Sequence, residues 1–119
     1  MTGVIWPTEL NVRDGGQTLS TAFETGERFE ISAELLRVES PSAEVKGHGP
    51  GQEQLVWGKR NVTIIRAEAV GNYAVRLIFS DGHSTGIFTW SYLFKLGTEQ
   101  HELMADYEVK LQAAGLRRS

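Results

Sequence analysis

Cysteine is absent from this sequence of 119 residues. Without thiols the chain cannot form a disulfide framework, use thiol catalysis, or bind zinc or an iron–sulfur cluster through thiolates. Long apolar runs are absent too: none approaches the roughly 20 residues that cross a bilayer, and the first residues show no basic segment followed by an apolar one. We therefore expect a cytoplasmic protein with no membrane partner.

The sequence also lacks a strong excess of positive charge: it has 12 basic and 15 acidic residues, and its net charge is -3. Nucleic-acid-binding domains need a clustered basic face that displaces counterions from phosphates. The dipeptides Lys59-Arg60 and Arg117-Arg118 are too short to provide one, so we expect no nucleic-acid partner. The hydrophobic fraction of 40% and charged fraction of 23% are those of an ordinary globular protein. We expect one folded domain over residues 1–119.

Turn signals divide the first two thirds of the chain into short extended pieces. Turns at residues 13–16 and 24–27 separate three apolar stretches and predict a three-strand meander. Ser32 is placed to cap a short helix over residues 33–38. Strands are then predicted over residues 61–69, 73–79 and 85–89, the last two joined by the tight turn Asp81-Gly82-His83. The segment from Ser40 to Gly58 is the longest loop and is rich in glycine.

The last third of the chain is predicted to be helical. A short helix over residues 91–96 would end at Gly97, and Thr98 would cap a final helix. The apolar positions of that final helix fall on one face: Leu103, Met104, Tyr107, Leu111 and Ala114. The predicted fold is a two-layer α+β domain, in which antiparallel β meanders pack with short helices and a C-terminal helix. Residues 5–97 would form its core and residues 98–119 the helix and tail.

No motif in the sequence indicates catalysis. The glycine-rich stretch 46–51 lacks the strand-to-helix context in which phosphate loops work. Ser80, Asp81, His83 and Ser84 lie within one turn, whereas a catalytic triad needs separate elements that converge. Local bonding of Asp81 within the turn, with an exposed His83, is the simpler interpretation. The aromatic residues are expected to be core rather than a stacking platform for bases: Phe79, Phe88, Trp90, Tyr92, Phe94 and Tyr107.

One metal-binding arrangement remains as an alternative. His48, Asp81 and His83 would form a two-histidine, one-carboxylate set, which is the ligand set of non-haem iron oxygenases. The turn already explains Asp81 and His83, and three scattered ligands are a sparse set. We therefore expect no metal and no other cofactor, with this set as the alternative.

The run from Gly71 to Trp90, followed by Tyr92-Leu93, resembles the gamma-butyrobetaine hydroxylase-like N-terminal domain family, and Leu35-Leu36-Arg37 before a Ser/Pro segment matches a second marker of it. The resemblance implies an α+β fold. In the hydroxylases this module is an accessory domain beside a separate jelly-roll oxygenase, and a similar module is attached to some P-loop iron–sulfur carrier proteins. No catalytic residue carries over to this sequence.

The resemblance also implies how a metal site was lost. The hydroxylase version binds structural zinc through a Cys-x-Cys-x-x-Cys cluster after the Leu-Arg marker and through the histidine of Asp-Gly-His. Here Ser40, Ser42 and Val45 stand at the cysteine positions, and only His83 remains. Hydroxyl and methyl groups do not replace three thiolates.

The function we expect is a non-catalytic accessory or protein-interaction module with a protein partner, linked by family analogy to iron–sulfur or oxygenase systems. A small metal-binding protein or metal-dependent enzyme is the alternative, and a nucleic-acid binder is the weakest hypothesis. Since the family brings the segment after Leu-Arg and the histidine to one metal, residues 40–58 and 81–83 should be neighbours. The binding surface is predicted there, with these candidate residues: Arg37, Glu44, Lys46, His48, Asp81 and His83.

Overall fold

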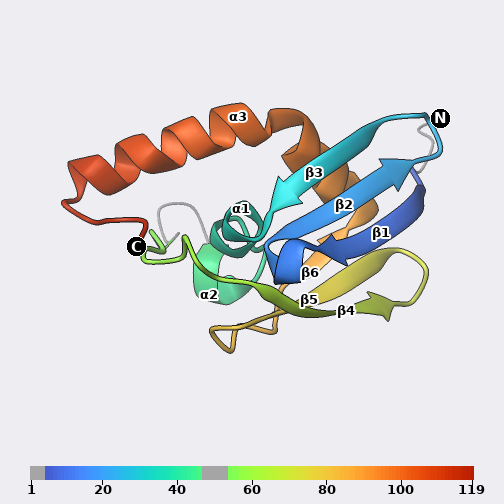
Figure 1. Cartoon of the computed structure of the whole chain (residues 1–119), viewed down its shortest axis with the longest axis horizontal. Coiled ribbons are helices and arrows are strands. Elements are labelled where there is room, and N and C mark those ends of the chain that lie inside the picture. Colours follow the sequence, from blue (N-terminus) through green and yellow to red (C-terminus); the bar gives the residue numbers. More distant parts are fainter. Residues whose placement is uncertain (1–4, 47–53) are drawn as a thin grey trace.

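The structure, a computed structural model, describes residues 5–46 and 54–119. Within them the chain forms six strands, three α-helices and one 3₁₀ turn (Figure 1). The elements follow the sequence in this order: β1 (Pro7–Arg13), η1 (Asp14–Gly16), β2 (Thr18–Phe23), β3 (Arg28–Ser32), α1 (Ala33–Val38), α2 (Ala43–Lys46), β4 (Ile64–Val70), β5 (Ala74–Phe79), β6 (Ile87–Thr89) and α3 (Trp90–Ala113).

The strands form two antiparallel sheets, ordered β1-β2-β3 and β4-β5-β6, so both predicted meanders are confirmed. In β5 the side chains of Val75, Leu77 and Phe79 are buried, as their alternation predicts. Tyr73, by contrast, lies in the preceding turn and is exposed. Gly82 has φ +92°, which confirms the positive φ expected of the turn after β5.

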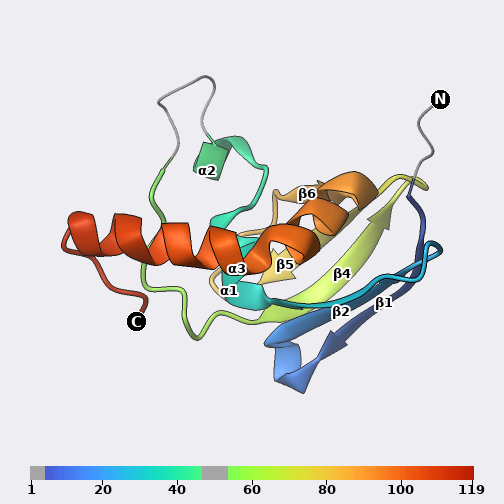
Figure 2. The ribbon, with the colours of Figure 1, turned by 90° about the horizontal axis from the view of Figure 1, so that it is seen from above.

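The helices pack against these strands, and the α+β class is confirmed. Helix α1 begins where the sequence predicts, because the Ser32 hydroxyl accepts a hydrogen bond from the Leu35 N–H at 3.1 Å. Leu35 and Leu36 are fully buried. Helix α3 contacts β3, β6 and α1, and Figures 1 and 2 show it running along the molecule past α1. All six aromatic residues expected in the core are buried or pack against it.

The prediction of two helices in the last third is wrong, because α3 is continuous from Trp90 to Ala113. Its N-cap is Thr89, whose hydroxyl accepts from the Tyr92 N–H, whereas Thr98 bonds back to a carbonyl inside the helix. Gly97 does not end a helix. A Cβ there would lie 2.5 Å from the Phe29 ring, so this glycine allows β3 to approach the helix closely.

The end of α3 returns the chain to the body of the protein. Gly115, with φ +71°, ends the helix as predicted. The tail then runs beside the segment that precedes β4, where the Gly58 N–H donates to the Arg117 carbonyl at 2.9 Å and the Arg60 N–H to that of Arg118 at 2.8 Å. Arg118 also donates two hydrogen bonds to the buried Glu34 carboxylate.

Candidate functional site

The residues after α1 and the turn after β5 meet in a polar cluster, here called the His83 cluster: the buried Ser40, Ser42 and His83, and the exposed Glu44. His83 Nε2 lies 2.9 Å from Ser40 Oγ and 3.3 Å from Ser42 Oγ, and Nδ1 lies 3.2 Å from Glu44 Oε2. The expectation of an exposed histidine is wrong, since its side chain is only 3% exposed. The partners that bury it lie about 40 residues earlier in the sequence, so the turn itself gave no sign of them.

The His83 ring is held in its neutral form. Burial, followed by the positive charge of Arg37, lowers the pKa of His83, and these effects outweigh the attraction of Glu44 and Asp81. A neutral ring with its proton on Nδ1 can donate a hydrogen bond to Glu44, while Nε2 accepts a hydrogen bond from one of the two serine hydroxyls. Both ring nitrogens therefore have hydrogen-bond partners within the protein.

Asp81 anchors the turn beside the cluster. Its Oδ2 lies 2.7 Å from Arg37 Nε and 2.6 Å from Lys59 Nζ, and its Oδ1 accepts from the His83 N–H at 3.0 Å. Burial alone would raise the pKa of Asp81, but the hydrogen bonds from Lys59, the His83 backbone and Arg37 lower it to about 2. The local bonding of Asp81 to the turn backbone is therefore confirmed, and its carboxylate also joins two cations.

The zinc site that the family resemblance implies does not fit these residues. Ser40 and Ser42 surround Nε2 of His83 at the positions of two cysteines, but neutral hydroxyls replace the thiolates. Val45, at the third position, is buried and has no donor atom. No group of three or more histidine, cysteine or acidic residues that could hold a metal occurs in the described part of the chain. His48 of the alternative metal set lies outside the described residues.

The predicted surface residues therefore divide between two sides of α2. On one side, Arg37, Glu44, Asp81 and His83 come together around the polar cluster, as expected from the resemblance. On the other side, Lys46 forms an ion pair with Glu39 at 2.8 Å. Burial would lower the pKa of Lys46, but the hydrogen bond from Lys46 to Glu39 raises it overall, and Lys46 stays charged.

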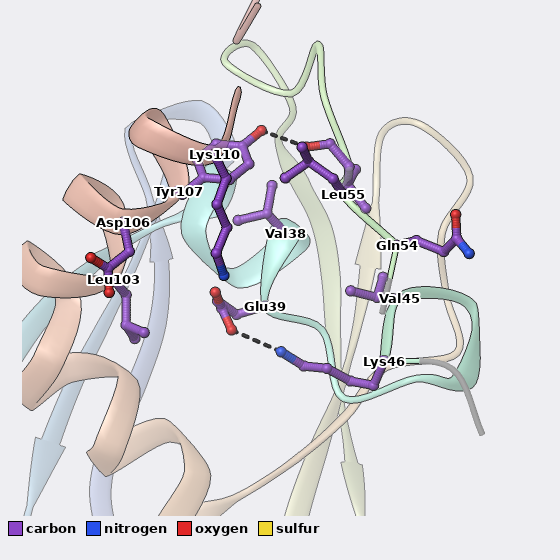
Figure 3. Close-up of a pocket in the computed structure, with 11 residues that line it drawn as sticks. Val38, Glu39, Val45, Lys46, Gln54, Leu55, Leu103, Asp106, Tyr107 and Lys110 are labelled. Carbon is purple, nitrogen blue, oxygen red and sulfur yellow. Dashed lines mark hydrogen bonds and ion pairs between the residues drawn. The ribbon is translucent and has the colours of Figure 1, made fainter. Parts of the chain in front are cut away.

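A pocket of about 150 Å³ opens on this second side, between the segment around α2 and helix α3 (Figure 3). The sequence did not indicate it, because its walls come from segments far apart in the chain, at residues 38–46, 54–56 and 103–110. Val38, Val45, Leu55, Val56, Leu103 and Tyr107 form its apolar walls, and Glu39, Lys46, Gln54, Asp106 and Lys110 its polar rim.

Two tyrosines fix the walls of this pocket. The Tyr107 hydroxyl donates to the Val56 carbonyl at 2.7 Å, which ties the chain before β4 to α3. Burial, with the negative charge of Glu34, raises the pKa of Tyr107 to about 12. The Tyr92 hydroxyl donates to the Glu39 carbonyl on the α1 side. Both phenols are therefore neutral donors that hold the walls in place.

These features define a small α+β domain in which a serine–histidine cluster joins the segment after α1 to the turn after β5. The chain belongs to the family described as gamma-butyrobetaine hydroxylase-like, N-terminal, whose sequence model matches residues 10–94. The resemblance seen in the sequence is thereby confirmed. No curated protein matches the chain.

Solved structures share the fold. One solution structure is 41% identical in sequence with a TM-score of 0.85, and the match covers 98% of this chain and 92% of the chain in that structure. A second solution structure is 43% identical with a TM-score of 0.82, and the match covers 99% of this chain and 90% of the other. A crystal structure from Acidithiobacillus ferrooxidans, of a protein of unknown function in the DUF971 family, is 38% identical with a TM-score of 0.64, covering 76% and 91%. None of the helices described in this chain is long and apolar enough to cross a membrane.

Proposed function

We propose that this chain is a non-catalytic protein-interaction module whose partner contacts the pocket between α2 and α3. The observation that carries the proposal is the position of α2 between the His83 cluster and an open pocket. On the side of the cluster Glu44 bonds His83 and Thr85, whereas Val45 and Lys46 line the pocket on the other side. Because one side of this short helix is held by the protein, its other side is presented in a fixed position, which reduces the entropy lost on binding.

The engagement of the titratable groups supports a non-catalytic role. A general acid or base must reach a substrate proton directly or through one water. His83 is buried with both ring nitrogens bonded, and Asp81 shares its carboxylate with Arg37 and Lys59. These contacts explain the polar residues by stability alone, since a buried polar group is costly without a partner.

The size of the pocket supports a protein partner. Sites for drug-sized molecules commonly measure roughly 300–1,000 Å³, whereas this pocket measures about 150 Å³. That volume suits one or two side chains. Apolar walls with a rim of both charges, from Glu39, Lys46, Asp106 and Lys110, suit an aliphatic anchor whose flanking backbone bonds to the rim.

The proposal includes a cytoplasmic location, no cofactor, and a protein partner rather than a nucleic acid or a membrane. A link to oxygenase or iron–sulfur systems rests on the family resemblance alone. The other predicted surface residues, Arg37, Glu44, Asp81 and His83, would then support the binding face from behind by fixing α2.

Affinity capture with matched variants tests the proposal. Leu103→Lys places a charge in the apolar wall, and Val109→Lys places the same charge on an exposed position of the same helix. We expect tagged wild type and Val109→Lys to retain the same protein from cell extract, and Leu103→Lys to lose about tenfold, since a buried charge without a partner costs more than 1.4 kcal/mol. Equal recovery by both variants, with equal melting temperatures, would contradict the proposal.

A further inference from the structure

The two basic dipeptides of the sequence meet in the fold. Lys59-Arg60 precedes β4 and Arg117-Arg118 lies in the C-terminal tail, and the backbone hydrogen bonds from Gly58 and Arg60 to the tail carbonyls place them side by side. Figure 1 shows the C-terminal end beside the green segment before β4. The structure thus gathers four positive charges in a chain whose net charge is -3.

Two of these four side chains are engaged in ion pairs and two have none among the described residues. Lys59 pairs with Asp81 at 2.6 Å, and Arg118 pairs with the buried Glu34 at 2.7 Å. Arg60 and Arg117 are exposed, and neither has an ion pair within residues 5–46 and 54–119. Because Arg118 anchors the tail by two hydrogen bonds to Glu34, the backbone of Arg117 is held beside the segment that carries Arg60.

A large exposed aromatic residue adjoins the free arginines. Trp57 is 56% exposed and directly precedes Gly58, whose N–H bonds the Arg117 carbonyl. Tryptophan and arginine are the residues most enriched among those that dominate protein–protein binding energy. An exposed indole and two exposed guanidinium groups on neighbouring backbone segments can offer an apolar contact and two carboxylate forks.

We propose that Trp57, Arg60 and Arg117 form a second interaction surface, which binds an acidic segment of a protein with an apolar side chain among its carboxylates. Carboxylates would pair with the two guanidinium groups, and the apolar side chain would cover the indole. The surface is separate from the pocket beside α2, since none of the three residues lines that pocket. The proposal therefore stands or falls independently of the function proposed above.

Charge favours an acidic peptide over a nucleic acid. Proteins that hold duplex DNA by its backbone commonly neutralise roughly 6–10 phosphates, whereas this surface offers two guanidinium groups that have no ion pair among the described residues. The net charge of -3 also repels a long polyanion. A short peptide with two or three carboxylates needs no larger basic area.

Nuclear magnetic resonance titration of the full chain tests this surface, with the Trp57 indole N–H signal as the readout. The probe is a synthetic peptide of alternating glutamate around a central leucine, and the control peptide has glutamine in place of glutamate. The double variant Arg60→Gln/Arg117→Gln removes the two free charges. Arg13→Gln/Lys95→Gln, at exposed positions elsewhere, changes the net charge equally.

We expect the glutamate peptide to shift the Trp57 signal and the glutamine peptide to leave it unmoved. The Arg60/Arg117 double variant should bind about tenfold more weakly, because each exposed ion pair contributes up to about 1 kcal/mol, and the Arg13/Lys95 variant should bind within about twofold of wild type. Three results would overturn the proposal: an unmoved Trp57 signal, equal losses in the two double variants, or an oligothymidylate that binds more tightly than the peptide.

Discussion

Replacing His83 by alanine should destabilise the protein strongly, although the sequence places this residue in a turn. An exposed histidine would contribute well under about 1 kcal/mol to the free energy of unfolding. In the structure the ring is buried, bonds Ser40 and Ser42, and lies with its centroid 6.0 Å from that of Phe79. Its removal therefore breaks hydrogen bonds and opens a cavity at once.

The magnitude follows from these two losses. Buried hydroxyls that lose a hydrogen-bond partner cost about 1–3 kcal/mol, partly offset here because Ser40 and Ser42 still bond each other at 3.3 Å. The vacated imidazole volume adds about 1–2 kcal/mol. We expect a total of about 2–4 kcal/mol for His83→Ala. Gly82→Val should cost about 1–3 kcal/mol, since φ is +92° but no atom lies within 4 Å of the added Cβ.

Urea denaturation of matched variants measures this difference. His101→Ala, on an exposed face of α3, is the control and should change the free energy of unfolding by less than about 0.5 kcal/mol. A double-mutant cycle with Ser40→Ala should give a coupling energy of about 1 kcal/mol between Ser40 and His83. A cost below about 1 kcal/mol for His83→Ala, or no coupling, would refute the buried cluster.

Three further predictions concern packing, pH and metal. Gly97→Ala should lower the free energy of unfolding by about 1–3 kcal/mol, because the added Cβ would lie 2.5 Å from the Phe29 ring. The cost of this overlap exceeds the gain in helix propensity, which is roughly 1 kcal/mol. Stabilisation of the variant in a urea melt would disprove the contact. Since the pKa of His83 is lowered on folding, the free energy of unfolding should decline as pH falls below the unfolded pKa of about 6.5, and His83→Ala should remove that decline. Because the pKa of Asp81 in the folded protein is about 2, a second decline in the free energy of unfolding should follow between about pH 4 and 2. A chelator should leave the melting temperature unchanged, whereas Ser40→Cys/Ser42→Cys places two thiolates beside His83 Nε2 and should take up zinc. A double variant that holds no zinc by elemental analysis would show that these three side chains do not converge on one metal.

Sequence reasoning succeeded where neighbours in the chain decide the structure. Ser32 caps α1 through a hydrogen bond to a residue three positions later, so the cap is visible in the sequence. The alternation in β5 likewise shows which side chains face the core. Gly82 and Gly115 take positive φ where the turn and helix-end signals place them.

Predictions from the sequence were wrong where residues distant in the chain determine the local structure. Gly97 followed by Thr98 looks like a helix end and a new cap, but the Phe29 ring of β3 occupies the space that a side chain would need, so the glycine lies within a continuous helix. The burial of His83 depends on Ser40 and Ser42, which are separated from it by 43 and 41 positions. The pocket escaped detection for the same reason.

The candidate site was partly foreseen through the family resemblance. It correctly placed the segment after α1 beside the turn that contains His83. Residue patterns alone did not show that this contact is closed, or that Lys46 faces α3 instead. Those features depend on which way each side chain of the four-residue helix α2 points, and so short a helix has no periodicity from which to predict it.

Site-specific photo-crosslinking can show whether a partner protein binds the pocket between α2 and α3. A photoreactive amino acid would replace Asp106 at the pocket rim, and in a parallel protein Ile65, which is 63% exposed on β4. The account predicts that irradiation in cells joins a single protein to position 106, that Leu103→Lys abolishes this product, and that position 65 gives none. Crosslinks at position 65 but not at position 106, or a product at position 106 that persists in Leu103→Lys, would contradict it.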